Sequence, residues 1–240
     1  METDKQKGVL YLIPTLLGEA PIVESWPEGH RKVINNLKVF IVENLRSARR
    51  FLKLAGYQHP FDEVTFHILN KHTTLHELTT FILPASSGSS IGLLSEAGCP
   101  CIADPGQMIV AQAHQMGIRV KPLVGPSSIM LALMASGMNG QAFQFHGYLP
   151  IQKQQRTNQL KQLEKLAEQT GTTQIFMETP FRNMQMLEDV LKSCRPDTMF
   201  CIAADLTTQN GFIRTQSIKT WLQQKLPNLH KRPAIFLLFR

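Results

Sequence analysis

Two glycine- and proline-rich stretches in the first half of the chain constrain its fold most strongly. The first is SEAGCPCIADPG, residues 95–106, and the second is VGPSS, residues 124–128. Each stretch follows an apolar run typical of a strand and precedes a run typical of a helix. In open α/β sheets, ligands bind at such turns, beyond the carboxyl ends of the strands. The two turns therefore predict an α/β enzyme with a bound small-molecule cofactor.

Apolar runs rich in Val, Ile, Leu and Phe alternate with helical segments along the whole chain. Ten runs are of strand type: 9–13, 39–43, 64–69, 91–96, 119–124, 142–147, 173–178, 199–204, 211–217 and 234–239. Continuous apolar runs are typical of buried strands in mostly parallel sheets. We expect two α/β lobes, residues 1–124 and 125–240, each with a roughly five-stranded sheet that is mostly parallel or mixed.

Helix start signals occur between these runs. Thr74 and Glu77 have the spacing of a capping box. Asp104 followed by Pro105 predicts an N-cap with proline at the first helical position. A threonine and a proline at 179–180 repeat that signal, which would place Arg182 three residues into a helix.

The balance of charges favours a polyanionic partner such as nucleic acid. The formal net charge is +7 and the isoelectric point about 9.4. The basic residues fall into three clusters, at 46–53, 153–165 and 225–232, instead of one tract. A solvated surface is the alternative interpretation of each cluster.

No apolar run approaches the 18 residues that a membrane span needs, and METDKQKG at the start has no apolar signal core. We therefore expect a cytoplasmic protein without a membrane partner. Metal binding is not expected. The four cysteines have the wrong spacing for a zinc site and are interpreted as reduced thiols; they are Cys99, Cys101, Cys194 and Cys201. Three histidines, His67, His72 and His76, have no carboxylate at the spacing of a metal ligand.

Four loops have the placement of ligand-binding turns: residues 14–19, 95–106, 124–128 and 178–182. Glycine in such loops lets the backbone approach a ligand closely. None of them has the spacing of a phosphate loop or of a dinucleotide fingerprint. ATP and NAD are therefore poor candidates for the cofactor.

Several motifs, spread over nearly the whole chain, resemble those of a known family and occur in the same order. They are GVLYLIPTLLGE, VENLR, SEAGCPCIADPG, PLVGPSSIMLALMASGM, FQFHGYLP, FMETPFR and ADLT. Together they resemble the tetrapyrrole methylase superfamily of S-adenosylmethionine-dependent methyltransferases. Within this superfamily, the chain resembles more specifically the branch of ribosomal RNA small subunit methyltransferase I.

The resemblance implies a two-lobed α/β protein, usually a homodimer, with S-adenosylmethionine held in a cleft between the lobes. It assigns the donor site to Leu16, Ser95, Glu96, Ala97, Gly98, Gly125, Pro126, Ser127 and Ser128. Small residues there would allow backbone contacts, and Glu96 could face the ribose hydroxyls or the ammonium group. Valine at Gly125 should then block cofactor binding while leaving the fold largely intact.

The function expected from this resemblance is methylation of a ribose 2′-hydroxyl in small-subunit ribosomal RNA, a step of ribosomal RNA processing. A ribose hydroxyl is a weak nucleophile that gains from a nearby base or cation. Glu43 with Arg46, and Glu178 with Arg182, could supply such pairs at strand ends. For Arg182, a functional or phosphate-binding role and a simple ion pair with Glu178 are both open.

The chain departs from the branch where the resemblance places the acceptor. Non-matching residues are Leu16, Glu19, Asn44, Leu45, Ala204 and Asp205. The resemblance also leads us to expect a divergent member without the small helical extension that follows the last strand in the branch. Two alternatives therefore stay open: a methyltransferase of a small molecule such as a tetrapyrrole, and a catalytically weakened protein that binds the cofactor or RNA. The general base and the acceptor atom are left unassigned.

Overall fold

The computed structural model describes residues 6–240. Contacts between Cα atoms divide the chain into two compact units, the first ending at Pro126 and the second beginning at Ser127. Each unit is built around its own five-stranded sheet.

The sheet of the first unit is parallel throughout, in the order β3-β2-β4-β1-β5. Its strands are β1 (Val9–Ile13), β2 (Val39–Val42), β3 (Thr65–Ile68), β4 (Ile91–Leu94) and β5 (Arg119–Pro122). The chain leaves β1 toward β2 and β3, returns to insert β4 beside β1, and ends with β5 on the other side of β1. This order creates a switch point around β1, where open α/β sheets bind ligands.

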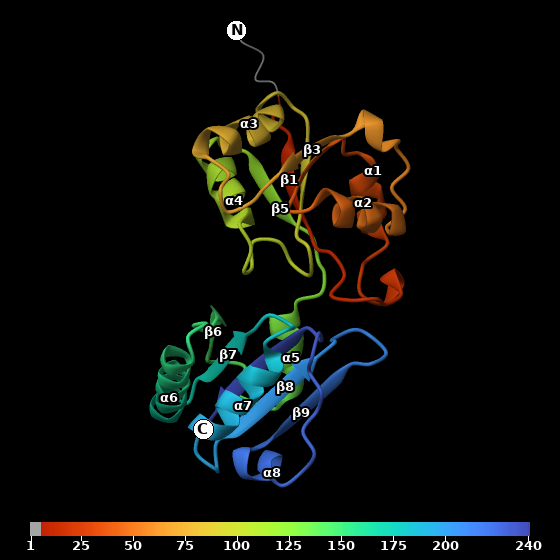
Figure 1. Cartoon of the computed structure of the whole chain (residues 1–240). Helices are drawn as coiled ribbons and strands as arrows, with labels where there is room; N and C mark the ends of the chain where they lie inside the picture. Colours follow the sequence, from red (N-terminus) through yellow and green to blue (C-terminus); the bar gives the residue numbers. More distant parts are fainter. Residues whose placement is uncertain (1–5) are drawn as a thin grey trace. The chain divides into compact units, whose positions relative to one another are not determined.

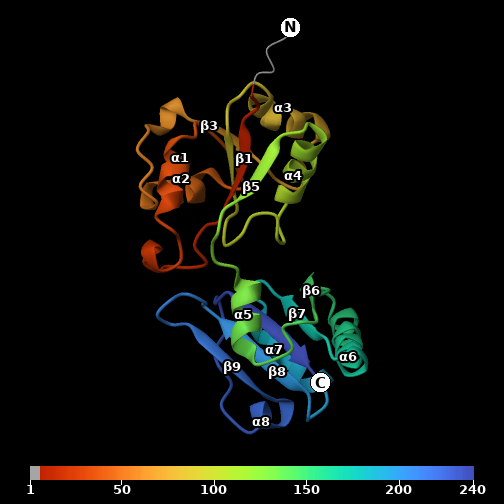
Figure 2. The same ribbon diagram turned by 180° about the vertical axis from the view of Figure 1, so that it is seen from behind.

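Helices cover both faces of this sheet (Figures 1 and 2). One face carries α1 (Gly29–Asn35) and α2 (Leu45–Leu54), and the other carries α3 (Leu75–Ser86) and α4 (Gly106–Gln115). Short 3₁₀ turns, Ile22–Glu24 and Phe61–Glu63, complete the unit.

Strand alternation sends neighbouring side chains of β2 into two separate cores. Phe40 packs with the α1 and α2 side, and Ile41 packs with the α3 and α4 side. On β4, a Cβ atom at Gly92 would lie 2.8 Å from both the Phe40 ring and Ile13 Cδ1. Only glycine leaves room there for the large apolar side chains of β1 and β2, and this packing holds three central strands in place.

The sheet of the second unit is mixed, in the order β6-β7-β10-β8-β9. Only the β6–β7 pair is parallel. The strands are β6 (Phe143–Tyr148), β7 (Thr173–Met177), β8 (Met199–Ala204), β9 (Phe212–Ser217) and β10 (Ala234–Phe239). The helices are α5 (Ser128–Ser136), α6 (Lys153–Thr170), α7 (Asn183–Ser193) and α8 (Ile218–Leu222).

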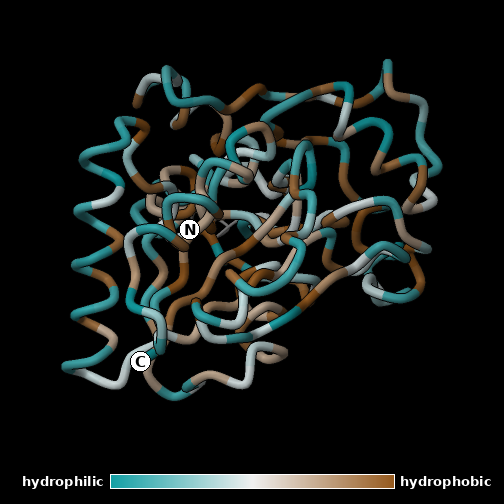
Figure 3. The backbone as a smooth tube through the Cα atoms, turned by 60° about the horizontal axis from the view of Figure 1, so that its bottom comes forward, coloured by the Kyte–Doolittle hydropathy of each residue, from teal (hydrophilic) through white to brown (hydrophobic). Residues whose placement is uncertain are grey.

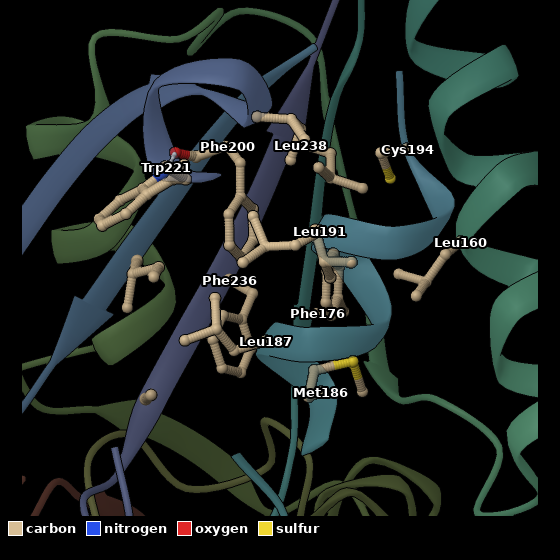
Figure 4. Packing of buried hydrophobic residues seen from close by; sticks show 14 of the residues in the cluster. Leu160, Phe176, Met186, Leu187, Leu191, Cys194, Phe200, Trp221, Phe236 and Leu238 are labelled. Carbon is tan, nitrogen blue, oxygen red and sulfur yellow. Dashed lines mark hydrogen bonds between the residues drawn. The ribbon is translucent and has the colours of Figure 1, made fainter. Parts of the chain in front are cut away.

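Helix α5 lies on one face of this sheet, against β9 and β10, while α6, α7 and α8 share the core on the other face. Figure 3 shows hydrophilic and hydrophobic residues alternating along the long helix α6, as a helix with one buried face requires. In the core, the rings of Phe176, Phe200 and Phe236 stack across three adjacent strands beneath α7 (Figure 4). The Trp221 indole closes one end of this cluster by donating a hydrogen bond to Phe200 O at 2.9 Å.

The predicted fold class is confirmed, with two α/β units of five strands each and a mixed second sheet. The capping box at Thr74 and Glu77 is also present. Two predicted helix starts are wrong. Helix α4 begins at Gly106, one residue later than expected, although Asp104 still accepts a hydrogen bond from the first helical N–H at 2.7 Å. Helix α7 begins only at Asn183.

No helix within residues 6–240 is long and apolar enough to cross a membrane.

Candidate functional site

The candidate loops of the first unit lie together at one edge of its sheet. Because all five strands are parallel, their carboxyl ends share this edge. β1 ends together with its apolar run, and the other four strands stop one or two residues before theirs, so the residues that follow lie in loops. The loops at this edge carry Pro14, Thr15 and Leu16 after β1, Glu43 after β2, Ser95 to Gly98 after β4, and Gly125 after β5.

The loop after β4 is a tight turn held by its own side chain. The buried Ser95 hydroxyl donates to Gly98 O at 2.6 Å, and Thr15 N from the neighbouring loop donates to the same carbonyl at 3.0 Å. Gly98 has a φ of +74°, which L side chains rarely adopt. Glu96 and Ala97 project from this turn and are exposed. The turn thus presents a carboxylate and a small side chain on a rigid base.

The loop after β5 comes into very close contact with the loop after β1. A Cβ atom at Gly125 would lie 2.2 Å from Pro14 Cγ. The carbonyl of Pro14 accepts a hydrogen bond from the buried indole Nε1 of Trp26 at 3.0 Å. The expectation that valine at Gly125 would leave the fold largely intact is therefore wrong, because any side chain there must displace the Pro14 ring.

Three carboxylates lie near one another at this edge. Glu43 Oε1 accepts a hydrogen bond from Glu96 N at 3.2 Å, and Asp104 accepts hydrogen bonds from Cys101 N and Gly106 N. Burial raises the pKa of Glu43, and the negative charges of Asp104 and Glu96 add to this effect. Burial also raises the pKa of Asp104. A half-buried carboxylate with a raised pKa holds a proton more readily than one in water, which suits a general base.

Helix α2 begins at Leu45, two residues after Glu43. Its N-cap is Asn44, whose side chain accepts hydrogen bonds from Arg46 N and Ser47 N. The Ser47 hydroxyl in turn donates to Glu96 Oε1 at 3.3 Å. Among residues 6–240 no ion pair joins Glu43 and Arg46, and the Arg46 side chain is exposed. Their expected role as a base and a cation for the acceptor stays a prediction.

In the second unit, Glu178 and Arg182 form an ion pair of 2.6 Å directly after β7. The Glu178 carboxylate is almost fully buried, and it also accepts the N–H of Thr179 at 2.6 Å. Arg182 lies before α7 instead of within it, since its N–H donates to Thr179 O in a turn. As the N-cap residue of α7, Arg182 lies at the positive end of the helix dipole, where a cation is disfavoured, and the Glu178 carboxylate offsets its charge. The buried Nε of Arg182 has no hydrogen-bond partner among residues 6–240.

The loop between β8 and β9 forms a hollow of about 560 Å³ in the same unit, lined by Asp205, Gln209, Asn210, Gly211, Phe212 and Arg232. Arg232 Nε pairs with Asp205 at 2.5 Å, and its other nitrogens donate to Asn210 O and Asn228 O. Asp205 has a φ of +49°. Arg232 thus fixes the strained turn that follows β8.

The remaining predicted site residues are placed as follows. Pro126 is buried, and its carbonyl accepts a weak hydrogen bond from Cys99 Sγ at 3.4 Å. Ser127 is the N-cap of α5, where its hydroxyl accepts from Met130 N, and Ser128 is the first helical residue. Trp26 was not singled out in the sequence, because nothing in the local pattern shows that a tryptophan far from the motifs reaches Pro14 O.

Among the residues considered for metal binding, His67 packs in the first unit and the cysteines form no disulfide. His67 stacks on Phe81 with ring centroids 4.6 Å apart, and burial lowers its pKa. The four cysteines are free thiols. Burial raises the pKa of Cys101 and of Cys194 to about 12.

Comparison with known proteins gives a family match over most of the chain. The family model described as Tetrapyrrole (Corrin/Porphyrin) Methylases matches residues 28–220. Ribosomal RNA small subunit methyltransferase I of Vibrio cholerae is 31% identical over 83% of this chain. The protein of the same name from Bacillus subtilis is 31% identical over 86% of it. The chain spans 65% of the length of the Vibrio protein and 67% of the Bacillus protein.

Among solved structures, the methyltransferase CobJ superposes with a TM-score of 0.63 at 14% identity, over 97% of this chain and 94% of its own. Uroporphyrin-III-C-methyltransferase from Thermus thermophilus superposes with a TM-score of 0.54 at 18% identity, over 97% and 92%. At these identities the likeness concerns the fold.

Proposed function

The chain belongs to the tetrapyrrole methylase family, and we propose that it is an S-adenosylmethionine-dependent methyltransferase that methylates a ribose 2′-hydroxyl of small-subunit ribosomal RNA. The observation that carries this proposal is the convergence of three loops at the carboxyl edge of the first sheet, where Ser95–Gly98 and Gly125 lie beside Pro14 and Thr15. The acceptor class follows the names of the relatives from Vibrio cholerae and Bacillus subtilis.

The residues at this edge fit the chemistry of the donor. Leu16, Ala97, Gly98, Gly125 and Pro126 would line its apolar parts. The exposed Glu96 would accept hydrogen bonds from its ribose hydroxyls or its ammonium group. The rigid turn at Gly98 and the close contact of Gly125 with Pro14 hold the backbone ready before the ligand arrives, which lowers the entropy cost of binding. Ser127 and Ser128 follow directly in the chain and complete the proposed donor set.

When bound, S-adenosylmethionine supplies a methyl group on a sulfonium, which needs no activation by the protein. The protein must therefore hold the acceptor oxygen in line and remove its proton. Glu43 is the carboxylate we propose for this proton, because burial and two neighbouring acids raise its pKa. Arg46, exposed in the first turn of α2, would then interact with the acceptor or with a phosphate next to it.

Glu178 and Arg182 form the second proposed pair. Their ion pair fixes the guanidinium after β7, and the Arg182 side chain stays 28% exposed. A fixed and partly exposed cation suits a phosphate or a developing alkoxide. We further propose that the protein is a cytoplasmic homodimer, as the family resemblance implies.

The test of the donor site is a calorimetric titration of the protein with S-adenosylmethionine, repeated for Glu96→Gln and Glu188→Gln. Glu188 is an exposed carboxylate of the second unit, paired with Lys192, and serves as the matched control. Loss of a charged acceptor at Glu96 should weaken binding about 10-fold or more. Absence of binding to the wild-type protein, or equal effects of both substitutions, would overturn the proposed site.

A further inference from the structure

Helix α2 carries four cations on one face. Arg46, Arg49, Arg50 and Lys53 follow the spacing i, i+3, i+4 and i+7, and all four are exposed. Residues with this spacing lie within about 100° of one another around a helix. The opposite face carries Ala48, Phe51 and Leu52, which are buried in the core. We name the exposed face with Arg46, Arg49, Arg50 and Lys53 the α2 cation stripe. Because the opposite face is packed in the core, the helix cannot turn, and the stripe points to solvent.

The α2 cation stripe has no compensating acid. None of the ion pairs formed by residues 6–240 includes any of its four side chains. Helix α2 contains no Asp or Glu, and its N-cap is the neutral Asn44. Elsewhere on the surface some cations are paired, as Lys38 is with Glu63 and Arg195 is with Glu168. Four uncompensated cations in about 10 Å of helix repel one another, and an anionic partner would remove this repulsion.

One end of the stripe lies at the proposed acceptor site. Arg46 is in the first turn of α2, three residues after Glu43, and Ser47 of the same turn contacts Glu96. Arg49 is also held in place, with its guanidinium 5.3 Å from the centre of the Phe66 ring and 5.6 Å from that of Phe61. The α2 cation stripe thus begins near Glu43 and runs along the helix to Lys53.

We propose that the α2 cation stripe binds the phosphate backbone of the RNA strand that carries the acceptor ribose. This inference rests on the proposed function and adds the surface that would hold the substrate. The roughly 10 Å between Arg46 and Lys53 match the length of strand that carries about two to three phosphates. Phosphate contacts of this kind set the register of a strand without reading its sequence, while base contacts elsewhere supply specificity.

The test uses Arg50→Gln/Lys53→Gln, because these two cations lie outside the proposed catalytic pair and outside the Arg49 ring contacts. The matched control is Lys161→Gln/Lys165→Gln on α6, which removes the same charge from two exposed lysines one turn apart. Binding of a fluorescein-labelled 20-nucleotide RNA is measured by anisotropy between 50 and 200 mM salt. S-adenosylmethionine affinity is measured in parallel by calorimetry.

The α2 variant should bind the RNA about 10- to 30-fold more weakly at about 0.1 M salt, and its slope of log K against log salt should be smaller by about 1.4. The control should change by less than about 2-fold, and donor affinity should stay the same in both. Equal RNA binding by the α2 variant and the wild type would overturn the proposal, as would equal losses in the α2 variant and the control. Binding of the wild type to phosphatidylserine vesicles but not to RNA would overturn it in favour of a membrane surface.

Failure of the proposed function gives a different result. In that case the wild-type protein binds no S-adenosylmethionine in the parallel titration, whatever the RNA measurement shows.

Discussion

The indole of Trp26 donates a hydrogen bond to the carbonyl oxygen of Pro14 at 3.0 Å, and the ring of Pro14 lies against the backbone of Gly125. Trp26 is only 5% exposed. One buried side chain thus fixes two of the three loops proposed to hold the methyl donor. Trp26 touches no proposed ligand group itself, so it is a positioning residue.

Trp26→Phe should lower the free energy of unfolding by about 1 to 3 kcal/mol, because the Pro14 carbonyl loses its partner in a buried place. It should also weaken S-adenosylmethionine binding several-fold. Trp221→Phe is the matched control, since Trp221 donates a similar hydrogen bond to Phe200 O in the second unit. The control should lose stability but keep donor affinity. Chemical unfolding and calorimetry measure both quantities, and equal donor affinity in all three proteins would contradict the positioning role.

Glu43→Gln tests the carboxylate proposed as the base. The pKa of Glu43 is raised in the folded protein, so its contribution to stability is present below the unfolded pKa of about 4.3 and is lost as pH rises through the folded pKa. The amide does not titrate and can still accept the Glu96 N–H. The variant should therefore be slightly more stable than the wild type at pH 7, with the difference vanishing near pH 4.

The same variant should transfer methyl groups about 10²- to 10³-fold more slowly. Stability gained together with activity lost is the pattern expected of a group kept for chemistry. A Glu43→Gln protein that is less stable at pH 7, or fully active, would show that this carboxylate has a structural role.

Asp189 and Arg156 form a buried ion pair of 2.5 Å between α7 and α6, with both side chains at most 4% exposed. Arg156 also donates to Pro150 O and Ile151 O, which ties down the loop after β6. Asp189→Ala should cost about 3 to 5 kcal/mol, because it leaves a buried charge without a partner. Glu188→Gln, next in the sequence but exposed, should change the free energy of unfolding by less than about 1 kcal/mol. Urea unfolding of both variants checks the difference.

The thiols should react slowly in the folded protein. Burial raises the pKa of Cys99 and Cys201, and it raises the pKa of Cys101 and Cys194 to about 12. Because the thiolate is the reactive form, reaction with a disulfide reagent at pH 8 should be about a hundredfold slower than in the unfolded chain. Rapid modification of any cysteine before unfolding would contradict the packing around it.

The sequence predicts the sheets better than it predicts the loops. Buried strands such as 234–239 are continuous apolar runs, and their pattern depends little on what surrounds them. The predicted start of α7 is wrong because the contacts of Glu178 outweigh the local helix signal of Thr179 and Pro180. The buried Glu178 carboxylate takes the Thr179 N–H and the Arg182 guanidinium, and so holds these residues in a turn.

Contacts between distant segments account for the rest of the candidate site. The motifs identify Ser95 and Gly125, but only the folded chain brings Gly98 O to Thr15 N, or Trp26 to Pro14. Likewise, only the folded chain shows that the Glu43 carboxylate accepts the N–H of Glu96, more than fifty residues away. Such contacts depend on strand order, which local spacing does not encode.

The most direct test of the account is transfer of tritiated methyl groups from S-adenosylmethionine to small ribosomal subunits that lack 2′-O-methylation. The account predicts that label enters the ribosomal RNA. After alkaline hydrolysis the label should remain in a dinucleotide, because a 2′-O-methyl group blocks cleavage of the next phosphodiester bond. Label that fails to enter the RNA, or that is recovered in mononucleotides as a methylated base, would contradict it.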